Sequence, residues 1–322
     1  MDVRDPVPSR GRIVTVTPNP SIDRTIEIGT LGVGGVNRAL DSLVDAGGKG
    51  VNVARALAAN GHPACAVLPT GGPDGQLLAG LLTRDGLEVR SVPTSGRTRT
   101  TIVIAELGGR ATKIDEPGAP MPPPAIDELL WTASDALDGA RWLVGCGSLP
   151  DRMRTDFYAE LVARGQRAGV AVALDSYGPP LAAGVEAGPD LVVADTEELA
   201  ELVGTHLASI EEVIDAAESV RARGVGTVVV SLGARGAVLV DGEPPLLAVP
   251  PPVVARRDAG AGDSLLAGFL AAATTRSTAL RTGVAWGAAA VSLPGTAVPE
   301  PADIHLDAVS LAPVRSEPSP TG

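Results

Sequence analysis

The amino-acid sequence predicts an α/β fold in which a mostly parallel central sheet carries helices on both faces. Short runs of β-branched residues alternate with longer helical patterns along most of the 322-residue chain, as expected for strands joined by helical crossovers. Strands buried between two helical layers are apolar on both faces, as these runs are. The hydrophobic content of 44% is sufficient for a large core without metals or disulfides.

Six apolar runs are predicted strands, and they cover 13–17, 64–69, 142–146, 170–175, 191–194 and 227–232. Five longer patterns are predicted helices, and they cover 51–60, 75–85, 156–168, 210–223 and 264–275. Segments 24–43 and 98–113 do not follow this alternation, because they carry strand-like residues punctuated by glycine. We expect them to form a small antiparallel sheet that serves as a lid over a bound ligand.

We expect residues 12–312 to form one domain between flexible ends at 1–11 and 313–322, which are rich in proline, serine and charge. The net charge of −12 and the lack of a basic run speak against nucleic-acid binding. Cys65 and Cys146 lie in apolar runs and are predicted to be buried free thiols. Neither a secretory signal nor a membrane span is evident, so we expect a cytoplasmic protein.

The sequence D-A-G-A-G-D-S at 258–264 directly precedes a helical pattern and predicts an anion site. The small residues Gly260, Ala261 and Gly262 leave backbone N–H groups free at the positive end of a helix dipole. We interpret Asp263 as a catalytic base that accepts a proton from a hydroxyl attacking a phosphate, and we expect the helix terminus to keep it ionised. The alternative is a glycine-rich helix start with Asp as the capping residue.

A second glycine-rich turn, D-A-G-G-K-G-V-N at 45–52, opens the next predicted helix. It matches neither a P-loop nor a dinucleotide fingerprint. Gly48 allows close approach of a ligand to the backbone, Lys49 supplies charge, and the Asn52 amide can bind sugar hydroxyls. The alternative is a strand-to-helix turn with an incidental lysine.

The first predicted strand ends in T-P-N-P-S-I-D at 17–23. The prolines make this turn rigid, and they place Asp23 at the carboxyl end of a strand. A carboxylate at that place can accept hydrogen bonds from a polyol. The alternative is an aspartate that only caps the turn.

Another turn, S-L-G-A-R-G, follows the last apolar strand and contains Ser231, Gly233, Arg235 and Gly236. This turn can pass under an adenine or its phosphates. A β-hairpin turn is an equally good interpretation.

Two arginines, Arg38 and Arg99, lie in or beside the predicted lid. In a chain this acidic, arginines that face a site suit a substrate phosphate, because the guanidinium pairs with it in a bidentate manner. The alternative is a pair of solvated surface residues.

Taken together and in this order, these motifs resemble the ribokinase (PfkB-type) sugar-kinase family, and the resemblance runs from about residue 12 to 298. The sequence G-S-L-P at 147–150 adds to it. Within the family, the chain is most similar to 1-phosphofructokinases and their tagatose-6-phosphate kinase relatives. The motifs that carry this closer similarity are V-N-R at 36–38, G-K-G at 48–50, G-R-T-R at 96–99 and T-K-I-D-E-P-G at 112–118.

The resemblance implies a ribokinase-like three-layer fold with a small β-sheet lid, and ATP and Mg²⁺ as cofactors. It implies that the sugar is held by Asp23, Gly48, Lys49 and Asn52. Its phosphate would be held by Arg38 and Arg99, with Ser148 nearby. ATP would be bordered by Ser231, Gly233 and Gly236. The anion hole would consist of Gly260, Ala261 and Gly262, and Glu198 would act on magnesium through water.

The departures from the family pattern lie on the nucleotide side. Family members usually have Lys-Pro-Asn before the helix that carries Glu198, where this chain has Val193, Ala194 and Asp195. Asp195 suits hydrated magnesium as well as Asn does, whereas Val193 cannot replace an ammonium. Asp258 also precedes the G-A-G-D motif, and an extra carboxylate repels phosphates unless a cation offsets it.

The expected reaction is transfer of the ATP γ-phosphoryl group to fructose 1-phosphate, giving fructose 1,6-bisphosphate. The alternatives are a kinase for tagatose 6-phosphate or fructose 6-phosphate, and a catalytically weak protein that binds sugar phosphates. A hydride-transfer enzyme lacks its dinucleotide fingerprint here. Family members also form dimers through the lid, and the apolar lid strands of this chain permit a homodimer.

Overall fold

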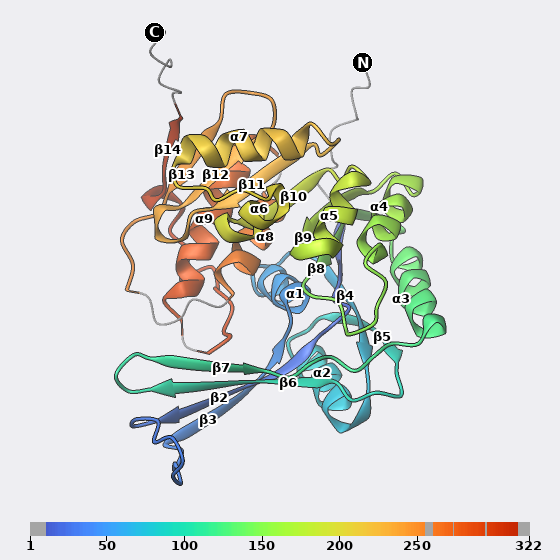
Figure 1. The fold of residues 1–322 in the computed structure, drawn as a ribbon, viewed down its shortest axis with the longest axis vertical. Coiled ribbons are helices and arrows are strands. Elements are labelled where there is room, and N and C mark those ends of the chain that lie inside the picture. Colours follow the sequence, from blue (N-terminus) through green and yellow to red (C-terminus); the bar gives the residue numbers. More distant parts are fainter. Residues whose placement is uncertain (1–10, 255–259, 273, 294, 315–322) are drawn as a thin grey trace.

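The computed structural model describes residues 11–254, 260–272, 274–293 and 295–314. In this part of the chain, the main sheet has ten strands in the order β14-β13-β12-β11-β10-β9-β8-β1-β4-β5 (Figure 1). Their bounds are β1 Arg12–Val16, β4 Ala64–Thr70, β5 Glu88–Pro93, β8 Ala140–Cys146, β9 Ala171–Asp175, β10 Leu191–Asp195, β11 Thr227–Ser231, β12 Ala237–Val240, β13 Leu246–Val249 and β14 Ser310–Pro313. The strands β5, β4, β1, β8, β9, β10 and β11 pair in parallel with their neighbours, whereas β12, β13 and β14 complete the sheet through antiparallel pairs.

Helices cover both faces of this sheet. One face carries α3 Pro123–Asp135, α4 Phe157–Arg167, α5 Gly178–Glu186, α6 Thr196–Val203 and α7 Ile210–Arg221. The other face carries α1 Lys49–Ala59, α2 Gly72–Arg84, α8 Ala261–Ala271 and α9 Arg276–Val291. Two short 3-10 helices are η1 Gly233–Arg235 and η2 Leu306–Ala308. The three layers predicted from the alternation of elements are confirmed.

The two-residue period of a strand divides its side chains between the two cores. In β10, Val192 and Ala194 pack into the core with α3 to α7, while Leu191 and Val193 pack into the core with α8 and α9. Both sets are buried, which explains why the strand reads as a continuous apolar run.

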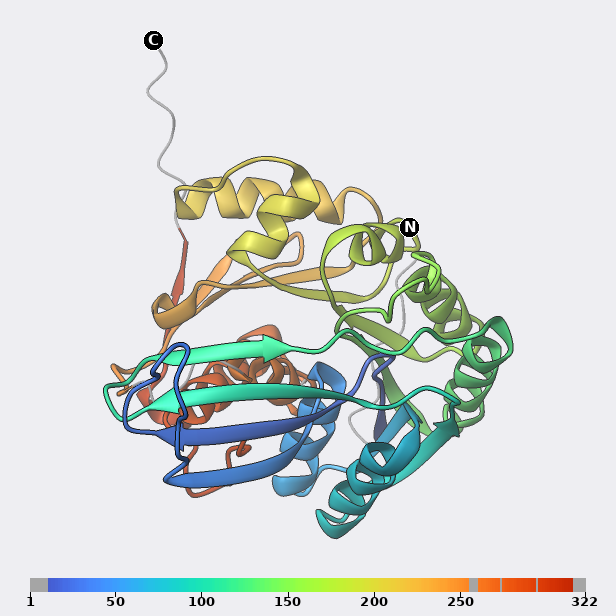
Figure 2. The same ribbon diagram turned by 60° about the horizontal axis from the view of Figure 1, so that its bottom comes forward.

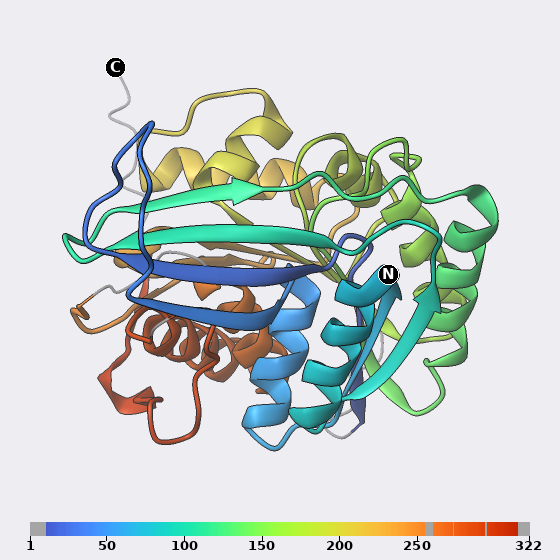
Figure 3. The ribbon, with the colours of Figure 1, turned by 90° about the horizontal axis from the view of Figure 1, so that it is seen from below.

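A separate four-stranded sheet crosses the body of the molecule (Figures 2 and 3). Its order is β3-β2-β6-β7, with β2 Ser21–Ile28, β3 Asp41–Gly47, β6 Arg99–Glu106 and β7 Ala111–Asp115. The small sheet is as expected, but it is mixed rather than antiparallel, because β2 and β6 pair in parallel. We call it the lid sheet.

All six predicted strands and all five predicted helices are confirmed, with ends shifted by a few residues. Helices α3, α5 and α9 were not among the predicted helices; α9 is buried along most of its length and so lacks an amphipathic period. The predicted C-terminal tail begins too early, since Pro313 belongs to β14 and the Val314 N–H donates to the Pro245 carbonyl at 2.9 Å. In the described parts of the chain, no helix combines the length and apolarity needed to cross a bilayer.

Candidate active site

Most of the predicted site residues lie where the central strands of the main sheet end. In the main sheet, β4 and β5 lie on one side of β1, and β8 to β11 lie on its other side, so the strand order reverses at β1. In sheets of this kind, a ligand crevice forms where the strand order reverses, beyond the carboxyl ends of the strands. The turn at 17–23 follows β1, and Ser148 follows β8. Strand β9 ends at Asp175, and β10 ends at Asp195.

Asp263 lies in the first turn of α8 and is buried. The capping interpretation is wrong for this residue, since Gly260 occupies the N-cap position and no side chain caps the helix. The Asn52 Nδ2 donates to Asp263 Oδ2 at 2.8 Å. Burial, followed by the nearby Asp175, raises the pKa of Asp263 to about 7, although Lys49 and Asn52 act in the opposite direction. Burial therefore acts against the expected effect of the helix terminus, which is to keep Asp263 ionised.

The predicted anion hole forms the start of α8. Gly260 is the N-cap, and Ala261 and Gly262 are the first helical residues. The first amides of a helix have no intrahelical acceptor and point outwards from its end. Gly262 is exposed, and a side chain there would meet no atom within 4 Å, which leaves room for a ligand. Asp258, which departs from the family pattern, lies outside the described residues.

The turn before α1 is built on Gly48, whose φ of 112° favours glycine. A Cβ on Gly48 would lie 2.9 Å from the Thr17 Cγ2, so the two turns pack tightly against each other. This packing aims Asn52 at Asp263. With its amide nitrogen used there, the buried Asn52 Oδ1 has no partner among the described residues. A ligand hydroxyl can supply the missing donor.

Lys49 forms ion pairs with two carboxylates. Its Nζ lies 2.7 Å from Asp175 Oδ1 and 2.9 Å from Glu198 Oε1. Burial alone would lower the pKa of Lys49, but these two carboxylates raise it well above its ordinary value. The two carboxylates therefore favour the charged form of the lysine. A role in holding the sugar stays a prediction.

Asp23 stands at the root of the lid sheet. The Ser21 hydroxyl donates to Asp23 Oδ1 at 2.6 Å, and Gly47 of the neighbouring strand lies directly against the carboxylate. Burial raises the pKa of Asp23, while Ser21 and Arg99 counteract this shift. The carboxylate keeps an oxygen for a ligand, as the polyol interpretation requires.

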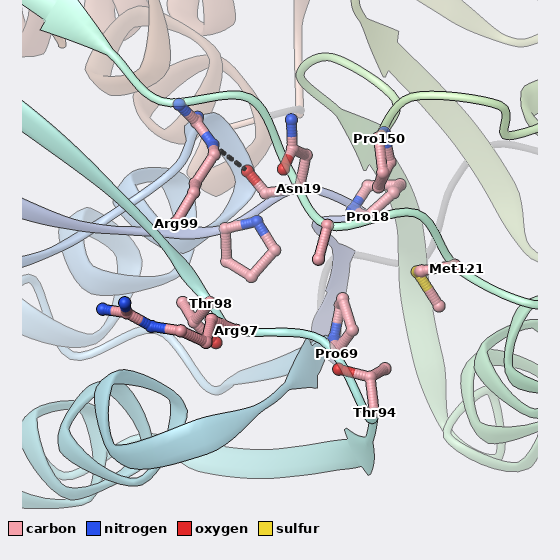
Figure 4. A pocket seen from close by; sticks show the side chains of 11 residues that line it. Pro18, Asn19, Pro69, Thr94, Arg97, Thr98, Arg99, Met121 and Pro150 are labelled. Carbon is pink, nitrogen blue, oxygen red and sulfur yellow. Dashed lines mark hydrogen bonds between the residues drawn. The ribbon is translucent and has the colours of Figure 1, made fainter.

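Arg99 and Ser148 are joined through Asn19, which lines a pocket at the root of the lid sheet (Figure 4). The Arg99 Nε donates to the Asn19 carbonyl at 3.2 Å, and the Asn19 Nδ2 donates to Ser148 Oγ at 3.0 Å. Sequence reasoning missed Asn19 and the pocket residue Arg97, although both lie inside motifs that it used. The signal that could have indicated Asn19 is its side-chain amide, which lies in the same turn motif as the predicted ligand Asp23.

The structure does not bring Arg38 to Arg99. Arg99 is paired in register with Ser21, whereas the loop that carries Arg38 is tied to the other end of β2 by the Leu40 N–H, which donates to the Glu27 carbonyl. Six residues of strand separate these ends, a distance of about 20 Å. Arg38 is exposed. The phosphate clamp predicted for the two arginines is therefore not formed within this chain.

The S-L-G-A-R-G turn links β11 to the antiparallel β12, so the hairpin interpretation is confirmed. Ser231 ends β11 beside Asp195 of β10, while Gly233 and Arg235 are exposed in η1 and Gly236 packs against β13. A hairpin does not exclude contact with a nucleotide, and that role stays a prediction.

Asp195 and Glu198 form a reciprocal cap at the start of α6. Asp195 Oδ1 accepts from the Glu197 and Glu198 N–H groups, and Glu198 Oε2 accepts from the Asp195 N–H at 3.0 Å. Val193, where the family has lysine, is buried in the core. Magnesium prefers oxygen ligands and retains waters, so the partly buried Glu198 carboxylate fits an indirect contact. Among the described residues, no group of three or more acidic, histidine or cysteine side chains is placed to hold a metal.

Asp175 is a further residue that sequence reasoning missed. It ends β9 with 4% of its side chain exposed and pairs with Lys49. The strand was predicted correctly, but its last residue gave no signal, because nothing local shows that a lysine 126 residues away will face it.

Comparison with known proteins identifies the family of the chain. The sequence profile described as "pfkB family carbohydrate kinase" matches residues 19–303. The chain is 39% identical over 265 residues to a 1-phosphofructokinase of Rhodobacter capsulatus, covering 82% of this chain and 84% of the relative. It is 34% identical over 291 residues to ATP-dependent 6-phosphofructokinase isozyme 2 of Escherichia coli, covering 88% and 94%, respectively. The crystal structure of phosphofructokinase-2 from Escherichia coli in complex with substrates and products superimposes with a TM-score of 0.86 at 33% identity, covering 91% of this chain and 96% of that one.

Proposed function

The chain belongs to the pfkB family of carbohydrate kinases, and on this premise we propose that it transfers the γ-phosphoryl group of ATP to fructose 1-phosphate. The product is fructose 1,6-bisphosphate. One contact carries the proposal: the hydrogen bond from Asn52 to the buried Asp263 at the start of α8. It places a base of raised pKa beside a helix N-terminus and an amide oxygen that has no partner among the described residues, which are the groups that a phosphorylated sugar and a transferring phosphate need.

In the proposed mechanism, Asp263 accepts the proton of the primary hydroxyl as that hydroxyl attacks the phosphorus. The N–H groups at 260–262 stabilise the negative charge on the transferring group. Asn52 Oδ1 and Asp23 accept hydrogen bonds from other sugar hydroxyls and fix the orientation of the attacking oxygen. Magnesium, when bound with the nucleotide and contacted through water by Glu198, would neutralise phosphate charge.

The sugar's own phosphate lies in the pocket of Asn19 and Arg99 in this proposal. The Arg99 guanidinium is held there by the Asn19 carbonyl and by Asp115, whose Oδ1 lies 3.5 Å from Arg99 Nη1. Closure of the lid sheet over the sugar would exclude water from the reaction. Ser231, Gly233, Arg235 and Gly236 would border the nucleotide on the opposite side.

The similarity to the Rhodobacter capsulatus 1-phosphofructokinase favours fructose 1-phosphate. The similarity to the Escherichia coli enzyme, which is named a 6-phosphofructokinase, favours fructose 6-phosphate as the second candidate. In both acceptors a phosphate and a primary hydroxyl stand at opposite ends of the sugar, so the same residues can serve either. Tagatose 6-phosphate has the same arrangement.

The test is release of ADP from Mg-ATP with the three sugar phosphates in parallel, each over a full concentration series. We expect the highest kcat/KM with fructose 1-phosphate, and a bisphosphate product by ³¹P NMR. A higher kcat/KM with another acceptor would replace the substrate. Binding of sugar phosphate without turnover of any would instead support the weak binding protein.

We also propose a homodimer through the lid sheet. Five apolar side chains of the lid region are exposed, namely Val33, Val36, Leu40, Leu43 and Ile114, and a contact with a second copy would bury them. Arg38 lies among them, so its predicted contact with a phosphate would require a neighbouring copy or a moved loop. Sedimentation should give a dimer for the wild type and a monomer for Val36→Asp, while a monomeric wild type would exclude the assembly.

A further inference from the structure

Lys49 lies between two carboxylates that come from different parts of the fold. Asp175 ends β9, Glu198 lies in the first turn of α6, and Lys49 reaches both from the start of α1. The ammonium is 2.7 Å from Asp175 Oδ1 and 2.9 Å from Glu198 Oε1. Only 4% of the Asp175 side chain and 16% of the Glu198 side chain are exposed, so neither carboxylate can rely on water for its solvation.

The charge balance of this cluster depends on Lys49. The cluster contains three carboxyl groups, those of Asp175, Glu198 and the nearby Asp263. Burial raises the pKa of Glu198 and of Asp263, and the charge of Asp175 raises both further. Among the described residues, Lys49 is the only cation that forms an ion pair with Asp175 or Glu198. Without it, two adjacent carboxylates would face each other at a place where phosphates must also approach.

Two carboxylate oxygens that converge on one point are typical of a divalent cation site. Here a lysine ammonium occupies that point. An ammonium adds one positive charge at a fixed position, and it cannot leave with the nucleotide. Two of its three N–H donors serve the carboxylates, and the third, which has no partner among the described residues, can donate to a ligand oxygen.

We propose that the Lys49 ammonium is a built-in cation that occupies the place between Asp175 and Glu198 which a free divalent cation would otherwise take. The enzyme then needs only the metal that arrives with its nucleotide. Asp175 acts as a positioning residue, because its contact fixes the ammonium beside Glu198. The metal-binding part of this proposal is independent of the proposed function, whereas its catalytic part rests on it.

The first experiment measures Mn²⁺ binding to the nucleotide-free protein by electron paramagnetic resonance. Lys49→Met should bind one Mn²⁺ per chain more tightly than the wild type, by on the order of 1,000-fold, the size expected for repulsion between two unit charges about 4 Å apart near a protein surface. Lys49→Arg keeps the charge and should behave as the wild type. Equal affinities for wild type and Lys49→Met would overturn the proposal.

Two further variants fix the location of the Mn²⁺. Lys49→Met/Asp175→Asn should lose the added affinity, because one of the two carboxylates is gone. Arg167→Met removes a surface cation that pairs with Glu160 at 3.3 Å and should leave Mn²⁺ binding unchanged. An affinity retained in the double variant would place the metal elsewhere and would also contradict the proposal.

Removal of Lys49 leaves two poorly solvated carboxylates unpaired, which destabilises the fold. Thermal unfolding therefore serves as a second readout. Mn²⁺ should raise the Tm of Lys49→Met and leave that of the wild type unchanged, since a ligand stabilises only the state that binds it. The double variant, with one fewer carboxylate, should be more stable than Lys49→Met. Equal Mn²⁺ responses of wild type and Lys49→Met would count against the proposal.

The catalytic part is tested by raising free Mg²⁺ at constant Mg-ATP. The wild-type kcat should stay flat, while the reduced kcat of Lys49→Met should recover with excess metal. A lysine that only held the sugar would give a raised acceptor KM that does not respond to free Mg²⁺, and this result would overturn the catalytic role. Absence of turnover with every sugar phosphate would refute the proposed function, while the Mn²⁺ result would still decide the site.

Discussion

The side chain of Asn52 donates to Asp263 Oδ2 at 2.8 Å across 211 residues of sequence. This contact joins the two glycine-rich turns that open α1 and α8. It orients the carboxylate at the helix start and leaves the Asn52 oxygen without a described partner. Both predicted motifs therefore contribute to one site.

Asp263→Asn should lower kcat by about 10²- to 10⁴-fold, the usual contribution of a general base. The amide keeps the size of the side chain, so the acceptor KM should change little. ADP release in a coupled assay measures the effect. Asp135→Asn, at an exposed aspartate far along α3, is the control and should retain wild-type turnover. Near wild-type kcat in Asp263→Asn would exclude Asp263 as the base.

The pH dependence of activity should follow the raised pKa of Asp263. Because the base works only when ionised, kcat/KM for the acceptor should rise with pH and level off above about 7. A profile that is flat between pH 5 and 8, measured with constant saturating Mg-ATP, would contradict this assignment.

The same raised pKa predicts an effect on stability. Between the ordinary value of 3.8 and about 7, the folded protein holds the Asp263 proton while the unfolded chain has lost it. Stability from this group is therefore full below pH 3.8 and falls as pH rises to about 7. The Tm of the wild type should decrease relative to Asp263→Asn over this window. A constant difference in Tm would show that the pKa is not raised.

Gly47→Ala should impair acceptor use, because the new Cβ would overlap the Asp23 carboxylate. A shift of this group by about 1 Å is expected to reduce kcat/KM for the acceptor on the order of 10²-fold. Gly80→Ala in α2 is the matched control, since a side chain there meets no atom within 4 Å; it should be active and somewhat more stable. Equal kinetics of the two variants would remove Asp23 from the sugar site.

Asn19→Ala should raise the acceptor KM about fivefold, the cost of about 1 kcal/mol for one lost hydrogen bond. It removes the donor to Ser148 Oγ and leaves the carbonyl that holds Arg99 in place. The KM for Mg-ATP should not change. Gln166→Ala, at an exposed position on α4, controls for loss of an amide. An effect on the KM for Mg-ATP alone would place Asn19 on the nucleotide side.

Asp195→Ala should lower the free energy of unfolding by about 1 kcal/mol, the usual contribution of an N-cap. Asp195→Asn should retain the wild-type stability, since Asn caps a helix equally well and the Oδ1 of Asp195 alone accepts both N–H groups. Denaturant unfolding measures both variants. Equal stability of Asp195→Ala and the wild type would show that the cap does not stabilise α6.

Much of the fold could be predicted because its signals are local. A strand such as β11 is apolar on both faces, and a helix such as α7 has a clear period and a capping box. Helix α9 and the parallel pairing of β2 with β6 were not predictable in this way. The first is buried along most of its length, and the second depends on which distant strands become neighbours.

The sequence by itself determined the order of elements and the motifs at the strand ends, and thereby the edge of the sheet where the site lies. Parallel topology brings all carboxyl ends to one edge, so Asp23, Ser148 and Asp195 had to gather there. Only the tertiary structure decided that Lys49 pairs with Asp175 and Glu198, that Arg38 lies far from Arg99, and that Asp263 has a raised pKa. These properties depend on burial and on which residues from distant parts of the sequence become neighbours in the fold, and no local sequence pattern encodes them.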